Sequence, residues 1–96
     1  MLARIRSVLV GRELDVTLMS KPGCELCNKA ERVARRVFGA RRVRAVNILE
    51  DRALEDTYVF RIPVLIVDGV EIAEGLITED DARRARAAAL RGRVAR

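Results

Sequence analysis

Residues 20–27 decide the fold and read Ser-Lys-Pro-Gly-Cys-Glu-Leu-Cys. They contain the chain's only two cysteines, Cys24 and Cys27, between an apolar run and a helix-like segment. A helix N-terminus offers unpaired backbone N–H groups and the positive end of the helix dipole, so a cysteine there loses its proton more readily than a free thiol, whose pKa is about 8.5. Cys27, one turn later, can attack a mixed disulfide formed by Cys24. The spacing therefore predicts a dithiol redox site.

The composition indicates one compact domain over residues 1–96. Half of the residues are apolar and a third are charged, and no segment approaches the roughly 20 apolar residues of a membrane span. Residues 1–13 are expected to be an N-terminal extension, either a helix or a loose arm. Arginines interrupt its apolar positions, which argues against a signal peptide and predicts a cytoplasmic protein. In that reducing compartment a close cysteine pair is more often catalytic or metal-binding than a structural staple.

The net charge of +5 comes almost wholly from arginine, because lysine occurs only at Lys21 and Lys29. Arginine clusters attract nucleic acid or acidic partners by electrostatics alone. However, one tyrosine, two phenylalanines and no tryptophan leave little for base stacking. The arginines are therefore interpreted as a solvated surface, and neither a nucleic-acid nor a membrane partner is expected.

The first half of the chain predicts a strand, a helix and a second strand. Leu14–Ser20 is rich in β-branched residues, and the Lys-Pro-Gly sequence that follows breaks the strand. Cys24–Phe38 is expected to be a helix that ends at Gly39, and Val43–Leu49 is expected to be the next strand. The apolar positions of the helix recur at three- and four-residue spacing: Leu26, Ala30, Val33, Ala34 and Val37.

The second half predicts a short helix, a hairpin and a final helix. Glu50–Tyr58 is charged and is expected to be the short helix. Ile62–Val67 is a nearly unbroken apolar run, typical of a buried central strand. Asp68–Gly69 forms a two-residue turn, and Val70–Glu74 returns from it.

The last helix is expected to run from Glu79 to about Leu90. Thr78 can cap its N-terminus, with Asp81 in the place that Glu or Gln usually takes in a capping box. Gly92 can end it. The predicted fold class is α/β: a βαβ half with parallel strands and a ββα half with antiparallel strands form one mixed four-stranded sheet with helices on its faces.

Pro63 stands near the start of the predicted central strand, where a missing backbone N–H is unusual. A trans proline that opens the strand is the usual arrangement, because cis bonds are a small minority of X–Pro bonds. A cis Ile62–Pro63 bond would also fit. The Ile62 backbone would then lie at the sheet's end, beside the first helix, where it can pair with an extended sulfur-containing substrate.

Three motifs follow one another in a specific order: Ser20–Cys27 between strand and helix, then Tyr58–Leu65, then the Asp68–Gly69 turn. Together they resemble a bacterial glutaredoxin-like protein of the thioredoxin superfamily, over roughly residues 14–90. The resemblance implies a thioredoxin fold and a cis bond before Pro63.

The same resemblance implies the roles of the site residues. Cys24 would be the nucleophile and Cys27 the resolving cysteine. In glutaredoxins a lysine just before the motif assists thiolate formation and contacts glutathione, and Lys21 stands in that place. The remaining substrate- or glutathione-binding positions would be Ile62, Pro63, Gly75 and Thr78.

Two segments depart from the glutaredoxin pattern. Glu25 and Leu26 replace the usual proline and tyrosine between the cysteines, and the Glu25 carboxylate opposes formation of the neighbouring thiolate. Glutaredoxins hold the γ-glutamyl end of glutathione with a Gly-Gly-x-Asp-Asp segment. The matching stretch, residues 74–78, reads Glu-Gly-Leu-Ile-Thr and keeps one glycine.

The expected function is thiol–disulfide exchange that reduces protein or small-molecule disulfides, with no bound cofactor and with glutathione or a reductase as electron donor. Because the chain has no histidine, a cysteine–histidine pair and histidine-containing zinc sites are excluded. The alternative is a non-catalytic thioredoxin-fold adaptor, or a metal or iron–sulfur protein that pools the cysteines of two chains. Tyr58 is interpreted as a packing residue and Asp15 as a solvent-facing one.

Overall fold

The structure is a computed structural model, and it describes residues 14–95; the expectation for residues 1–13 lies outside these. The elements in chain order are β1 (Val16–Ser20), α2 (Glu25–Phe38), a 3₁₀ turn (Ala40–Arg42), β2 (Val43–Asn47), a second 3₁₀ turn (Ile48–Glu50), α3 (Arg52–Tyr58), β3 (Val64–Val67), β4 (Val70–Glu74) and α4 (Glu79–Ala95). Each predicted helix and strand is present, with shifts of a few residues at several ends.

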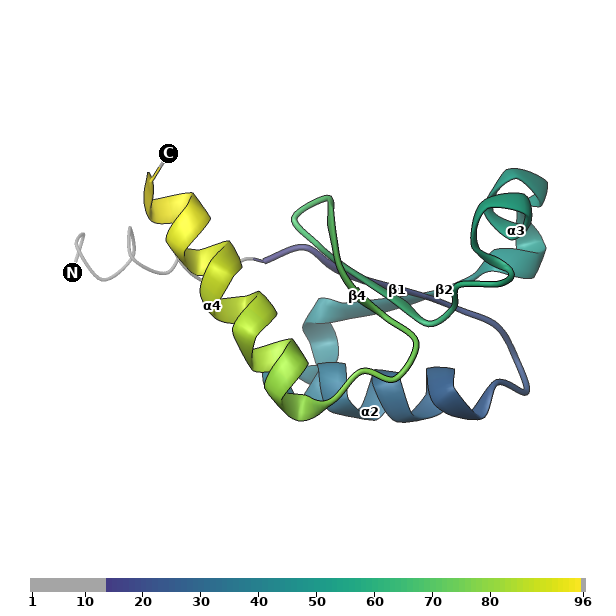
Figure 1. Cartoon of the computed structure of the whole chain (residues 1–96), viewed down its shortest axis with the longest axis horizontal. Helices are drawn as coiled ribbons and strands as arrows, with labels where there is room; N and C mark the ends of the chain where they lie inside the picture. The colour runs from purple at the N-terminus through teal and green to yellow at the C-terminus, as the bar shows by residue number, and fades with distance from the viewer. Residues whose placement is uncertain (1–13, 96) are drawn as a thin grey trace.

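The strands form one mixed sheet in the order β2-β1-β3-β4. β1 and β2 are parallel, whereas β1 with β3 and β3 with β4 are antiparallel, so the predicted βαβ and ββα halves are confirmed. α2 and α4 contact each other and the sheet, and α3 lies at the far end of the molecule from the C-terminus of α4 (Figure 1). β3 is a central strand, as its apolar sequence predicted.

The core lies between the sheet and the two long helices. Leu18 of β1 pairs with Leu65 of β3, and both side chains are fully buried on this face. Full burial of one such side chain stabilises the fold by about 1.5–3 kcal/mol. α2 contributes Cys27, Ala30 and Ala34, which follow helical spacing. Small side chains at these positions let the helix approach the strands closely.

Leu26 was expected on the apolar face of α2, but its side chain is 43% exposed. The buried stripe passes through Cys27 instead, about 100° further around the helix. The helix therefore turns a cysteine rather than a leucine toward the core.

Side-chain caps explain where two elements differ from their predicted bounds. β2 stops at Asn47, because its side-chain oxygen accepts a hydrogen bond from the Leu49 N–H at 2.9 Å and starts a 3₁₀ turn. α3 begins after Asp51, whose carboxylate accepts hydrogen bonds from the N–H groups of Ala53 and Leu54. Both side chains accept hydrogen bonds from backbone N–H groups that have no partner within the helix.

The predicted end of the last helix near Leu90 is wrong, because α4 continues through Gly92 to Ala95. A glycine ends a helix when it adopts a positive φ, as Gly39 does at 98° after α2. Gly92 stays helical, so it weakens α4 without ending it.

The same substitution at these two glycines should have opposite effects. Gly92→Ala should raise the free energy of unfolding by about 0.5–1 kcal/mol, because alanine is the better helix former and the added Cβ meets open space. Gly39→Ala should lower it by about 1–2 kcal/mol, because an L side chain is strained at its positive φ. Urea unfolding of the two variants and the wild type measures both differences. Changes of the same sign in the free energy of unfolding would contradict this account.

Candidate functional site

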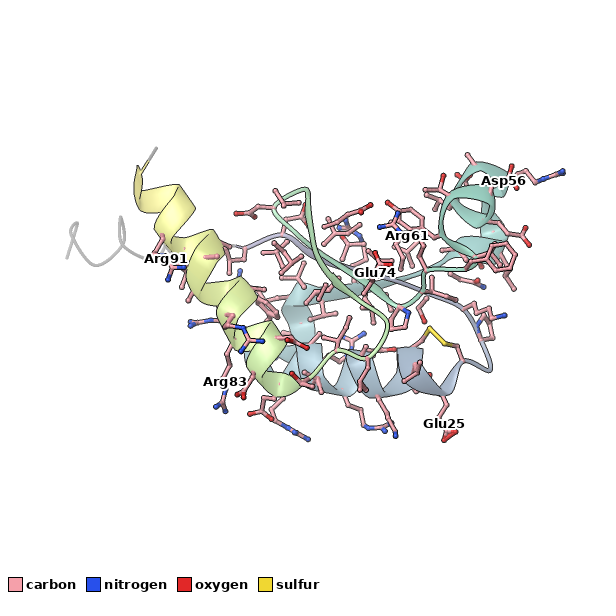
Figure 2. All side chains as sticks on the ribbon, in the orientation of Figure 1. Glu25, Asp56, Arg61, Glu74, Arg83 and Arg91 are labelled. Carbon is pink, nitrogen blue, oxygen red and sulfur yellow. A yellow bond between two sulfur atoms is a disulfide. The ribbon has the colours of Figure 1, made fainter. Side chains whose placement is uncertain are left out.

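The two cysteines predicted to form the site are joined by a disulfide at the N-terminus of α2 (Figure 2). Their Cα atoms are 5.2 Å apart. Cys24 is the N-cap residue of the helix, and its Sγ accepts a hydrogen bond from the Cys27 N–H at 3.2 Å. Its carbonyl oxygen accepts one from the Asn28 N–H at 3.0 Å. A sulfur atom thus takes the place that a serine or aspartate oxygen usually holds.

The two sulfur atoms differ in their access to solvent. Cys27 is 0% exposed, whereas Cys24 is only partly buried. Glu25 is exposed, and its side chain points away from the disulfide (Figure 2). A molecule arriving from solvent therefore reaches Cys24 first.

Pro63 lies at the same end of the sheet as the cysteines, because Met19 near the end of β1 pairs with Val64 at the start of β3. The Ile62–Pro63 bond is cis, as the resemblance implied, and Pro63 is buried. The Pro63 carbonyl accepts a hydrogen bond from the Gly75 N–H at 2.9 Å. These two predicted site residues are therefore in contact.

The backbone of Ile62 is only partly available to a substrate. Its N–H donates to the Tyr58 carbonyl at 3.0 Å, at the C-terminal end of α3. Within residues 14–95 its carbonyl oxygen has no backbone hydrogen bond. The expected pairing of the Ile62 backbone with an extended substrate is therefore restricted to the carbonyl.

Lys21 lines a hollow that Gly75 does not border. The hollow has a volume of about 220 Å³ and is bounded by the end of β1, the first turns of α2 and the end of β2. Gly75 follows β4, at the opposite edge of the sheet order. The cysteine motif thus has Lys21 on its β2 side and Gly75 on its β4 side.

Thr78 caps α4 in the reciprocal arrangement that its sequence predicted. The Thr78 N–H donates to Asp81 Oδ2 at 2.9 Å, and the Asp81 N–H donates to Thr78 Oγ1 at 3.1 Å. The bond from the Thr78 backbone is the largest of the effects that hold the pKa of the Asp81 carboxyl below its ordinary value; Arg84 contributes as well. The Asp81 carboxylate therefore occupies the anion-binding position at the start of α4.

This cap should make stability depend on pH through Asp81. Because its pKa is lowered on folding, its contribution is complete above the ordinary aspartate pKa, about 3.9, and is lost as the pH falls through the folded value. Asp81→Asn should therefore be less stable than the wild type at pH 7, and the difference should close in acid. Urea unfolding between pH 7 and pH 2.5 tests this. Asp80→Asn, in the same turn but outside the cap, is the control and should change much less.

Arg61 is a residue of this region that the sequence analysis did not single out. Its guanidinium binds Glu71 at 2.5 Å and Glu74 at 2.9 Å, and Figure 2 shows it beside Glu74. Tyr58 donates its hydroxyl to Glu71 at 3.0 Å, so it is more than a packing residue. This bond raises the pKa of Tyr58, while Arg61 and Tyr58 together lower the pKa of Glu71. The signal available in the sequence was the position of Arg61, directly before Ile62 and Pro63.

Three further observations concern the described residues as a whole. Asp15 is solvent-facing, as predicted, and pairs with Arg44 at 3.6 Å. Among the residues that the structure describes, no group of three or more histidine, cysteine, aspartate or glutamate side chains is placed to hold a metal ion. Within residues 14–95, no helix has the length and apolar character needed to cross a bilayer.

The family model of the glutaredoxin-like domain (DUF836) matches residues 15–93 of the chain. The chain belongs to this family. The match takes in both cysteines, the Arg61–Pro63 segment and the cap of α4 in one domain. The search of curated proteins found no match to this chain.

Solved structures with the same fold are also found. Target protein XcR50 of Northeast Structural Genomics, from X. campestris, is 29% identical with a TM-score of 0.66, over 76% of this chain and 96% of that one. A mutant thioredoxin from Halobacterium salinarum NRC-1 is 20% identical with a TM-score of 0.60, over 92% and 84% of the two chains. Oxidized glutaredoxin 2 from Chlamydomonas reinhardtii is 19% identical with a TM-score of 0.50, over 98% and 90%. The glutaredoxin-like domain therefore has the predicted thioredoxin fold, and its cysteine pair supports a redox-type function.

Proposed function

We propose that this glutaredoxin-like domain is a thiol–disulfide oxidoreductase that reduces disulfides through Cys24 and Cys27. The observation that carries the proposal is the placement of the Cys24 sulfur at the N-cap of α2, where it accepts the Cys27 N–H at 3.2 Å. In the reduced protein this hydrogen bond and the helix dipole stabilise the Cys24 thiolate. We expect the pKa of Cys24 to lie below that of a free cysteine thiol.

The reaction has two exchange steps. The Cys24 thiolate attacks one sulfur of the substrate disulfide, forms a mixed disulfide and expels the other substrate sulfur as a thiolate. Cys27 then loses its proton and attacks the Cys24 sulfur. This step closes the Cys24–Cys27 disulfide and expels the second substrate thiolate. The substrate gains two electrons and, once its thiolates are protonated, two protons, while the two cysteines lose the same number.

Exposed apolar side chains support protein disulfides as substrates. Leu26 stands between the cysteines, Phe60 precedes the Ile62–Pro63 bond, and Leu76 follows Gly75. Phe60 is 98% exposed and Leu76 is 69% exposed. Large apolar side chains in segments that adjoin a site favour contact with another polypeptide over contact with a small polar thiol.

The electron donor of the proposed reaction is a dithiol protein or a flavoprotein reductase rather than glutathione. A γ-glutamyl carboxylate at the start of α4 would compete with Asp81 for the Thr78 N–H. It would also meet the exposed Asp80 carboxylate in the same turn, whereas Glu79 is paired with Arg36 and Arg83. A reducing compartment such as the cytoplasm suits this chemistry, and the role there would be electron transfer in redox homeostasis.

Serine variants of the two cysteines separate the two steps. Cys24→Ser should lower the rate of disulfide reduction at least about 100-fold, because the alcohol is not ionised at neutral pH. Cys27→Ser should instead stop at the mixed disulfide, because the resolving thiol is gone. Mass spectrometry of the reduced variants, mixed with a small disulfide, should show the added half-substrate on Cys27→Ser and not on Cys24→Ser. A wild-type pair that does not cycle between dithiol and disulfide would contradict the oxidoreductase proposal.

The donor is tested by following NADPH consumption in two coupled reactions. We expect turnover with a thioredoxin-reductase system and little turnover with glutathione and glutathione reductase. Faster turnover with glutathione and glutathione reductase would show that the donor assignment is wrong. It would not contradict the proposed exchange chemistry. Arg52→Gln, at an exposed position at the start of α3, provides a variant control for both reactions.

A further inference from the structure

Four side chains form a polar cluster between the end of α3 and the edge strand β4; we call Tyr58, Arg61, Glu71 and Glu74 the Arg61 cluster. Arg61 Nη2 binds Glu71 Oε1 at 2.5 Å and Glu74 Oε1 at 2.9 Å, and Arg61 Nε binds Glu74 at 3.2 Å. Its guanidinium lies over the Tyr58 ring, 5.3 Å from the centroid. The cluster is not used in the exchange steps described above.

A β-bulge brings the two glutamates to the same arginine. In a regular strand, residues three apart point to opposite faces. Between β3 and β4, however, Leu65 pairs with Ala73 while Ile66 pairs with Glu71, so Ile72 is an extra residue. Because of this extra residue, Glu71 and Glu74 lie on the same face of the sheet, and the Arg61 guanidinium reaches both carboxylates.

The cluster ties down the loop that carries Pro63. Arg61 and Ile62 both donate their backbone N–H groups to the Tyr58 carbonyl, at 2.8 and 3.0 Å. Glu74 pairs with Val64, and the next residue, Gly75, donates its N–H to the Pro63 carbonyl at 2.9 Å. The loop is therefore held to β4 on both sides of Ile62. Before Ile62, the Arg61 side chain binds Glu71 and Glu74, and after it the Pro63 carbonyl accepts the hydrogen bond from Gly75.

We propose that Arg61 is a positioning residue for disulfide exchange: its fork to Glu71 and Glu74 holds the Ile62–Pro63 loop where a substrate disulfide must lie to meet Cys24. This inference rests on the proposed function. Two carboxylates already hold the guanidinium, so Arg61 acts through the loop and not as an anion-binding group. Partly exposed ion pairs contribute little to stability, and Arg61 is 34% exposed, so its loss should affect positioning more than folding.

Two reactions of the Cys24 sulfur should depend differently on Arg61. Alkylation of reduced Cys24 by iodoacetamide needs only an accessible thiolate, whereas attack on a disulfide also needs the substrate to be aligned. Arg61→Gln should therefore lower kcat/KM for disulfide reduction by about tenfold, since small misplacements of reacting groups are costly. The alkylation rate and its dependence on pH should stay within about twofold of the wild type.

A conservative variant and a double variant distinguish lost positioning from a folding defect. Arg61→Lys keeps the charge but not the planar fork and should fall between the wild type and Arg61→Gln. Glu74→Gln alone should lower kcat/KM, but added to Arg61→Gln it should cause little further loss, because both changes break one interaction. Arg44→Gln, which breaks the Arg44–Asp15 pair elsewhere on the sheet, is the matched control and should leave kcat/KM unchanged.

The outcomes distinguish this inference from the function on which it rests. No exchange by the wild type would overturn both. Wild-type exchange that Arg61→Gln leaves intact would overturn the positioning role alone. A parallel fall in exchange and alkylation would also overturn it, because that result would mean that Arg61 acts on the thiolate or on the fold in general.

Discussion

The close packing of α2 against the sheet is the constraint on which the site depends. Cys27, Ala30 and Ala34 form the buried face of the helix, and none of these three side chains is larger than a cysteine. This contact sets the distance of α2 from the strands. Cys24 is the N-cap residue of the same helix, so its sulfur lies at the positive end of the helix dipole. Core packing and thiol chemistry are thus two consequences of one helix face.

Two carboxylates beside the Pro63 loop are paired within the protein: Arg61 binds Glu71 and Glu74. Negative charge close to a thiolate would disfavour its formation, but in these ion pairs the positive charge of Arg61 offsets that of the carboxylates. Glu25, in the first turn of α2, is exposed, and its side chain points to solvent (Figure 2).

Much of the fold could be predicted because local signals agreed with each other. The turn at Asp68–Gly69, the cap at Thr78 and the stop at Gly39 each have a chemical cause within a few residues. The Arg61 cluster could not be predicted in this way, because it depends on which residue of β4 is skipped in pairing with β3. The end of α4 was missed for a related reason. Gly92 is compatible with either a helix or its end, and only the backbone conformation decides between them.

The extra residue in β4 also affects how the sheet's edge behaves toward other chains. β4 is an edge strand, and Val70 and Ile72 are exposed on it. A flat apolar edge is a template for strand addition by a second molecule and so for aggregation. The bulge at Ile72 interrupts the regular spacing of the outer backbone groups, and two glutamates occupy one face beside it. The feature that gathers the carboxylates around Arg61 thereby also makes the edge a poor partner for self-association.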